Sequence, residues 1–419
     1  MSVAAVLPVS RSSSVVLNLG DAPAVISLAS LIGDAALSAK VNSLVERGDA
    51  PGCIHALLPA ASTLLASSQY SNGQVSSAFA ILASTAEESG VEGSALHDLL
   101  LEIANTAKSA GSASEKPEEK AQRSAARVKA LAAVYHVAAA PVTRANILQI
   151  LLETAHERNV DALVAPVLAR VDSWVEAWAL PTAEAQKLHR ACVDVAEALY
   201  AGETGGPAAE RAACTAVLER MEAYLKTFEA PGSNAAAGVE VARRACALFL
   251  AAPHTFASDM LNLSAVKALA SAPDAASKAA GSLLTAFLTG TNDAVASALS
   301  AHKAALPALG LDEGKLRSKA RLCMLAAAAS ASRANGGNGV VSYADLRATL
   351  GTSDDMVLEA TVLEAVHHGV VVAKMDQIES TVTFEDVTPR VFGDEEWKTL
   401  LHDLKRWEVG LQRLMHVTL

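Results

Sequence analysis

Short segments with a helical pattern follow one another through about the first 330 residues, and turns that contain proline or glycine separate them. The turns recur about every 15 to 35 residues, as in "WALPT" at 178–182 and "AGETGGP" at 201–207. Between the turns, apolar residues lie three or four positions apart, as at Ile147, Ile150 and Leu151. Because short helices in series bury their apolar faces on their neighbours, this pattern predicts a mainly α fold built from helical hairpins, an α-solenoid.

The composition agrees with a large helical core. The chain has 419 residues, of which 51% are hydrophobic and only 4% are aromatic, and alanine, the best helix former, is abundant. This length allows two or three domains or one long repeat array. The net charge of −11 argues against binding nucleic acid or acidic membranes by bulk electrostatics.

The cysteines and the hydropathy indicate an intracellular protein. Five cysteines are widely spaced without a CxxC pair, which favours reduced, buried thiols over a zinc site or a disulfide framework. No window of about 20 continuous apolar residues is present, and the N-terminus lacks the pattern of a signal peptide. We therefore expect no membrane span and a cytoplasmic location.

The pattern changes after the glycine-rich stretch at 334–339. Ser342 is a candidate N-cap for a short helix that ends at Gly351, and Ser353 is a candidate cap for a second helix that ends at Gly369. The runs "VVVAKM" and "TVTF" then read as two strands around the turn "DQIES". Two short helices followed by a hairpin is the order of a winged helix.

The second of these helices is acidic, which argues against DNA binding. Residues 340–390 hold nine acidic and three basic residues, and the helix itself has no Lys or Arg. Such a helix would repel the phosphate backbone, so a protein-binding winged helix is favoured. The predicted apolar stripe of this helix comprises Met356, Ala360, Leu363 and Val366.

Two adjacent histidines, His367 and His368, fall in the last turn of the second helix. Neighbouring residues on a helix point about 100° apart, so the two imidazoles are poorly placed to share one metal ion. We expect a structural or interface role for them.

The C-terminal segment shows a heptad pattern. Its apolar residues are spaced alternately by three and four positions, which is typical of a helix with an a/d seam. The helix either folds back on its own winged helix or joins a bundle with partner chains, and both alternatives remain open. The seam comprises Trp397, Leu400, Leu404, Trp407, Leu411 and Leu414.

Motifs for catalysis, metals or cofactors are not found. "HERNV" lacks the second histidine of a zincin, and His189 and Cys192 have no further ligand pair nearby in sequence. We expect no enzyme, metal or cofactor. One candidate basic stripe is read first as a solvated helix face, with contact to RNA or an acidic partner as the minority alternative. It comprises Lys315, Arg317, Lys319 and Arg321.

The stretch 341–384 resembles the winged helix of PCI-domain proteins throughout, including "KMDQ" and the "TVTF" return strand. Four further stretches resemble one subunit of eukaryotic translation initiation factor 3, and the similarity extends from about residue 120 to the end. These stretches are 141–155, 172–180, 256–269 and 387–411.

The resemblance implies a non-catalytic scaffold whose partners are other PCI and MPN subunits of the initiation factor 3 complex and, through that complex, the small ribosomal subunit. It also implies a role in preinitiation complex assembly and mRNA recruitment. A PCI subunit of the proteasome lid or signalosome is the alternative. Nucleic-acid-binding PCI proteins should carry a basic winged helix, unlike this one.

The resemblance also implies domain boundaries and an assembly edge on the hairpin. The expected regions are 1–120 with a charged loop at 109–120, 121–338 with a PCI part from about 215, the winged helix at 339–386, and the C-terminal helix at 387–419. The expected winged-helix interface comprises His367, Val370, Val371, Val372, Lys374, Asp376 and Gln377.

Overall fold

The computed structural model is mainly α-helical, which confirms the predicted fold class. It describes residues 24–66, 69–109, 117–230, 234–256, 259–333, 338–390 and 394–418. These residues form nineteen α-helices, several short 3-10 turns and three strands. The chain divides into two compact units, Met1–Thr227 and Phe228–Leu419, each with its own core.

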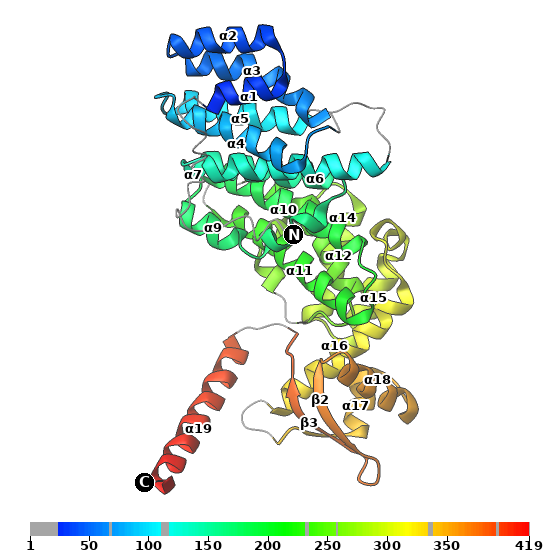
Figure 1. Cartoon of the computed structure of the whole chain (residues 1–419). Coiled ribbons are helices and arrows are strands. Elements are labelled where there is room, and N and C mark those ends of the chain that lie inside the picture. Colours follow the sequence, from blue (N-terminus) through cyan, green and yellow to red (C-terminus); the bar gives the residue numbers. More distant parts are fainter. Residues whose placement is uncertain are drawn as a thin grey trace. The chain divides into compact units, whose positions relative to one another are not determined.

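The first unit is a stack of helices (Figure 1). Successive layers contact one another, α4 on α6, α6 on α7, α7 on α10 and α10 on α11. Layers that contact mainly their neighbours are the arrangement of an α-solenoid. The helices are α1 (Ala24–Ile32), α2 (Ala35–Glu46), α3 (Ala50–Ala66), α4 (Asn72–Glu88), α5 (Ser94–Ser109), α6 (Pro117–Val137), α7 (Pro141–Glu157), α8 (Ala165–Leu168), α9 (Val171–Trp178), α10 (Thr182–Ala201) and α11 (Pro207–Lys226).

The predicted turns separate these helices, with one correction. The structure ends α9 at Trp178 and begins α10 at Thr182, as the "WALPT" turn predicts. The charged loop expected at 109–120 is shorter than predicted, because α6 already begins at Pro117. A proline suits the first turn of a helix, where its missing N–H group costs no hydrogen bond. Residues 110–116 of that loop lie outside the described residues.

The thiols are buried, as predicted. All five cysteines are free. Burial raises the pKa of Cys192 and of Cys246 to about 12, so these thiols stay protonated at neutral pH. Among the described helices, none is long and apolar enough to cross a membrane.

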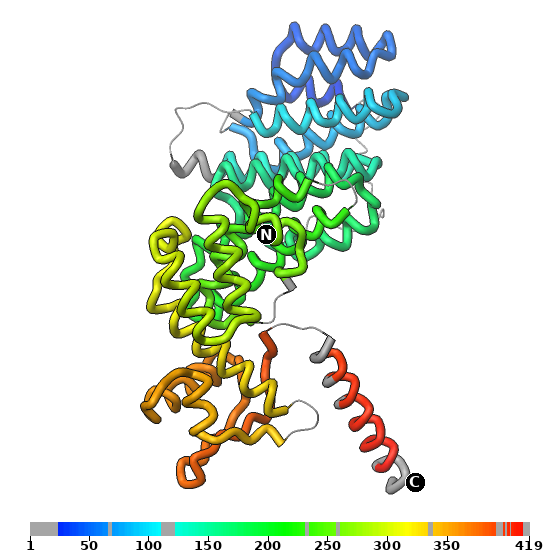
Figure 2. Tube along the Cα trace, turned by 180° about the vertical axis from the view of Figure 1, so that it is seen from behind, coloured from blue at the N-terminus to red at the C-terminus, as the bar shows by residue number. Residues whose placement is uncertain are grey.

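The second unit joins further helices to a small sheet. Its helices α12, α14 and α16 contact one another, and α16 contacts α17, α18 and two strands. Figure 2 follows this path along the Cα trace. The helices are α12 (Val239–Ala251), α13 (Ser264–Ala268), α14 (Ala275–Thr289), α15 (Asn292–Ala301), α16 (Glu313–Arg333), α17 (Tyr343–Leu350), α18 (Asp355–His367) and α19 (Asp394–Thr418).

The sheet has three antiparallel strands in the order β1-β3-β2, which are β1 (Val340–Ser342), β2 (Val371–Asp376) and β3 (Thr381–Val387). The predicted hairpin is β2 and β3. The first strand was not predicted, because three residues show no period-2 pattern and β1 forms only by pairing with β3, distant in sequence.

The two helices next to the sheet are capped largely as the sequence predicts. The Ser342 side chain caps α17, and Gly351 ends it with a left-handed φ of 64°. The predicted cap of α18 is wrong by one residue, since Asp354 and not Ser353 accepts the Met356 N–H, at 2.9 Å. A carboxylate is the stronger choice there because it also interacts with the positive end of the helix dipole.

The C-terminus of α18 forms a Schellman motif. The N–H of Gly369 donates to the Val366 carbonyl at 3.0 Å, and the N–H of Val370 donates to the Ala365 carbonyl at 2.9 Å. Gly369 adopts a φ of 72°, a conformation that glycine reaches without the steric cost of a Cβ atom. The chain turns here from α18 directly into β2.

Candidate partner-binding surfaces

The elements β1, α17, α18, β2 and β3, called the helix–sheet module below, are fixed to α16 by an arginine. Arg333 at the end of α16 donates from Nη1 to the Phe384 carbonyl at 3.2 Å and also to the Glu385 carbonyl. Phe384 is itself fully buried in the module. The hairpin is therefore held from the helix that precedes it.

The predicted interface valines of the hairpin do not share one environment. Val370 and Val371 are buried, with 2% of Val371 exposed, whereas 52% of Val372 is exposed. The first two valines therefore belong to the core of the module, which corrects their predicted place at a surface. Val371 and Val372 point to opposite faces of β2, because side chains alternate along a strand, and Val370, which precedes the strand, is buried. Only Val372 of the three is therefore available to a partner.

Most polar groups predicted for the hairpin interface already have partners inside the module. Lys374 forms an ion pair with Glu385 on the neighbouring strand. Asp376 Oδ1 accepts two backbone N–H groups of the turn, at 3.0 and 3.1 Å. Gln377 Nε2 donates to both carboxylate oxygens of Glu359, at 3.0 Å. The Gln377 contact ties the hairpin turn to α18.

The outer edge of β2 carries features that limit uncontrolled strand pairing. The sheet order leaves β2 at an edge, and the ladder is irregular between Val372 and Ala373. A bulge and an exposed lysine, Lys374, are common in natural edge strands for this reason.

The two histidines pack against each other at the end of α18. His367 is exposed and His368 is half-buried. Their rings meet edge to face, with centroids 5.2 Å apart and an angle of 64° between the planes. Among the described residues, no group of three or more His, Cys, Asp or Glu side chains could hold a metal ion.

The apolar stripe predicted for α18 faces outward. Exposure reaches 78% at Met356 and 59% at Leu363, and Ala360 and Val366 are also exposed. The buried side of the helix is formed instead by Leu358, Thr361, Val362 and Ala365. The sequence already indicates an exposed apolar face, because α18 has apolar residues on two faces and only one of these faces can pack on the sheet.

The C-terminal helix α19 also exposes its predicted seam. Trp397, Leu400, Leu404, Trp407 and Leu411 are all exposed in the second unit. The side chain of Leu414 lies outside the described residues. In the single chain, no other described element covers these seam residues.

The predicted basic stripe on α16 is not one surface. Lys319 is 1% exposed, and its Nζ donates to the Phe249 carbonyl and, at 2.7 Å, to the Ala252 carbonyl. The ammonium group also lies 4.0 Å from the centroid of the Phe249 ring. Carbonyls at the C-terminal end of α12 thus attract this lysine into the core.

The other three basic residues of the stripe differ in exposure. Lys315 and Arg317 are exposed, and Arg317 forms an ion pair with Glu313 at 2.7 Å. Arg321 is half-buried, 3.5 Å from the Ser318 hydroxyl. Without Lys319, the exposed positive charge on this helix is reduced to two residues next to an acid.

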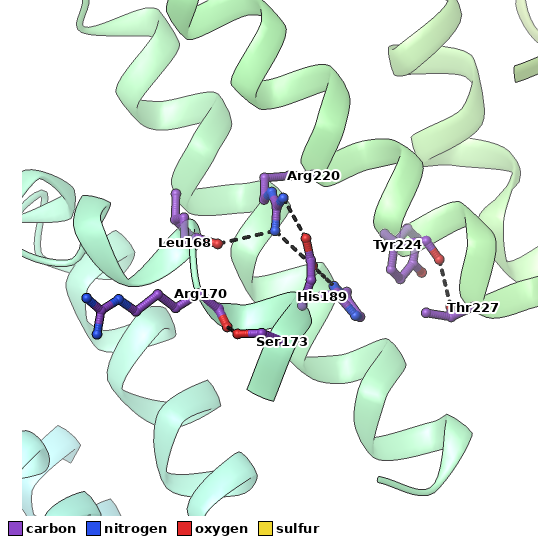
Figure 3. A network of polar contacts seen from close by, with 8 residues as sticks. Leu168, Arg170, Ser173, His189, Arg220, Tyr224 and Thr227 are labelled. Atoms are coloured by element: carbon purple, nitrogen blue, oxygen red, sulfur yellow. Dashed lines mark hydrogen bonds and ion pairs between the residues drawn. The ribbon is translucent and has the colours of Figure 1, made fainter. Parts of the chain in front are cut away.

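The first unit contains a partly buried polar network, in which 45% of the Asp172 side chain stays exposed (Figure 3). Arg220 forms an ion pair with Asp172 at 2.7 Å and donates to the Leu168 carbonyl at 3.2 Å. His189 Nδ1 lies 3.8 Å from Asp172 Oδ1. Burial lowers the pKa of His189, the Asp172 charge opposes this change, and the Arg220 charge adds to it. The network joins α8 and α9 to α10 and α11.

Helix α9 also carries two tryptophans of an aromatic cluster. Trp174 and Trp178 stack with ring centroids 5.9 Å apart, and Tyr135 lies 6.3 Å from Trp174. Burial raises the pKa of Tyr135 to about 12. The cluster packs α6 against α9, so the tryptophans that carried part of the resemblance have a structural role in the first unit.

The chain is similar to proteins named eukaryotic translation initiation factor 3 subunit M. The one from Aspergillus clavatus is 28% identical over 286 residues, which are 68% of this chain and 55% of that protein. For Aspergillus oryzae the identity is 29% over 265 residues, 61% and 52% of the two chains. For Phaeosphaeria nodorum it is 27% over 253 residues, 60% and 53%. No family model matches the chain.

The aligned region is a larger share of this chain than of its relatives. About two thirds of this chain is aligned, but the chain spans only about half the length of the curated relatives it matches. These relatives are subunits of the initiation factor that the sequence motifs also resemble.

Proposed function

We propose that this chain is a non-catalytic scaffold subunit of the eukaryotic translation initiation factor 3 complex. In this role it supports assembly of the preinitiation complex on the small ribosomal subunit and recruitment of mRNA in the cytoplasm. The observation that carries the proposal is the similarity to initiation factor 3 subunit M. An α-solenoid with exposed apolar surfaces suits a scaffold, since such surfaces need partners.

In the same proposal, the helix–sheet module is the winged helix of a PCI domain that begins near residue 215. The order of its elements, two helices followed by a hairpin, supports this assignment. Its partners are other PCI and MPN subunits of the complex. Contact with the small ribosomal subunit is made through the complex.

Two surfaces are proposed to hold the chain in the complex. The first is the outer edge of β2, where Val372 is exposed and main-chain groups face outward. The second is the seam of α19, where Trp397 and Trp407 are the side chains best suited to anchor a helical bundle.

A tagged pull-down under gentle salt, read by mass spectrometry, tests the proposal. The full-length chain is compared with a chain that ends at Arg390. Recovery of initiation factor 3 subunits and small ribosomal proteins by the full-length chain is expected, with loss on truncation if α19 is the main anchor. Recovery of proteasome lid or signalosome subunits instead would overturn the function and leave the fold unaffected.

A further inference from the structure

Helix α18 is apolar on both of its long faces. Leu358, Val362 and Ala365 face the core of the module, while the outer stripe of Met356, Ala360, Leu363 and Val366 is exposed. A surface helix of a globular protein normally keeps its apolar residues on the one face that meets the core. An outer stripe about 120° wide and about 15 Å long therefore has the dimensions of a contact with one further helix.

Carboxylates lie within and beside this stripe. Glu359 lies within it, one turn from Met356 and from Leu363, and its carboxylate accepts hydrogen bonds from Tyr343 and Gln377. Glu364 lies beside the stripe on α18, and Glu379 lies in the hairpin turn that Gln377 ties to Glu359. Among the described residues, the side chains of Glu364 and Glu379 have no ion pair or hydrogen bond. Ile378, which is 93% exposed, adds a further apolar side chain to the same turn.

We propose that the outer stripe of α18 binds an amphipathic helix of a partner protein, with apolar residues at intervals of three and four and Lys or Arg on its flanks. The apolar face of the partner helix covers Met356 and Leu363, and its basic residues pair with Glu364 and Glu379. This surface is independent of the initiation factor assignment, because it follows from the burial pattern and charge of α18 alone.

Charge argues against two of the other occupants. A second copy of the chain that presented the same stripe would bring the same carboxylates to the contact and be repelled. Nucleic acid is excluded for the same reason, since no Lys or Arg lies on α18. Helix α19 begins with three acidic residues but also carries Lys398, Lys405, Arg406 and Arg413, so charge alone does not exclude it, and the cross-link must distinguish it from a partner helix.

Photo-cross-linking in native cells tests this proposal. A benzoylphenylalanine replaces Leu363 in the full-length chain, and a second chain carries it at the exposed Val142 of the first unit as control. The captured peptide is sequenced after digestion. We expect the Leu363 probe to capture one discrete peptide with helical apolar spacing and at least one flanking Lys or Arg.

The charge is tested with two variants of equal net charge. Glu364→Lys with Glu379→Lys should lower capture by the Leu363 probe about fivefold, since each reversal replaces an attraction by a repulsion. Glu210→Lys with Glu219→Lys, both exposed in the first unit, should leave capture unchanged.

Several outcomes would overturn the proposal. These are capture no greater than from Val142, capture of α19, of a second copy or of nucleic acid, a peptide without basic flanks, or capture that both charge variants change equally. A pull-down that recovered the wrong complex would refute only the proposed function, because the chemistry of the cross-linked peptide is read separately.

Discussion

Lys319 places a cationic group inside the core of the second unit, where two carbonyls at the end of α12 accept its hydrogen bonds. Lys319→Ala removes both bonds and leaves a cavity, so we expect it to lower the free energy of unfolding by about 2 to 4 kcal/mol. Lys315→Ala, on the exposed face of the same helix, should change it by less than about 0.5 kcal/mol. Denaturant unfolding measures both, and equal effects would contradict the buried role of Lys319.

Protonation of His189 should make the stability of the first unit depend on pH. Burial holds its folded-state pKa below the ordinary value of 6.5, so the unfolded chain binds its proton first as the pH falls. The stability that neutral His189 provides is complete above about pH 6.5 and is lost as the pH falls toward the folded-state pKa.

His189→Gln cannot be protonated and should remove part of this pH dependence. Between pH 7.5 and 5, we expect the Tm of the natural chain to fall more steeply than that of the variant. Asp172 and Arg220 lie next to position 189 in both proteins, so their charges contribute equally to both Tm curves. Parallel Tm curves would show that His189 does not titrate in this range.

At the scale of elements, the sequence predicts what depends on neighbours along the chain. The proline and glycine turns, the Ser342 cap and the hairpin around "DQIES" are local signals, and the structure contains each of them. What depends on distant residues was missed. Strand β1 needs β3, the burial of Lys319 needs the carbonyls of α12, and only the packed sheet decides which apolar face of α18 turns inward.

Tertiary packing also gives two neighbouring valines of β2 different environments, one buried and one exposed. Val371→Lys puts a charge into the core of the module, and we expect a loss of at least about 3 kcal/mol in the free energy of unfolding. Val372→Lys replaces an exposed side chain and should change it by less than about 0.5 kcal/mol. If the β2 edge is an assembly surface, Val372→Lys also lowers subunit recovery in the pull-down without lowering Tm. Retained recovery would remove this edge from the proposed interface.

At the scale of the whole molecule, the division at Thr227 and Phe228 gives each unit a separate core. The turn spacing that predicts an α-solenoid does not reveal this division, because similar turns occur on both sides of it. Compact units with their own cores commonly unfold as separate cooperative units.

We therefore expect calorimetry of the full chain to show two unfolding transitions. Arg220→Ala breaks the ion pair with Asp172 in the first unit and should lower one transition by several degrees, and Lys319→Ala should lower only the other. Because the two substitutions act on different cores, their effects in the double variant should add. A single transition that both substitutions shift would mean that the chain unfolds as one cooperative body. In that case the stability of the surfaces on α18 and α19 would depend on the whole solenoid.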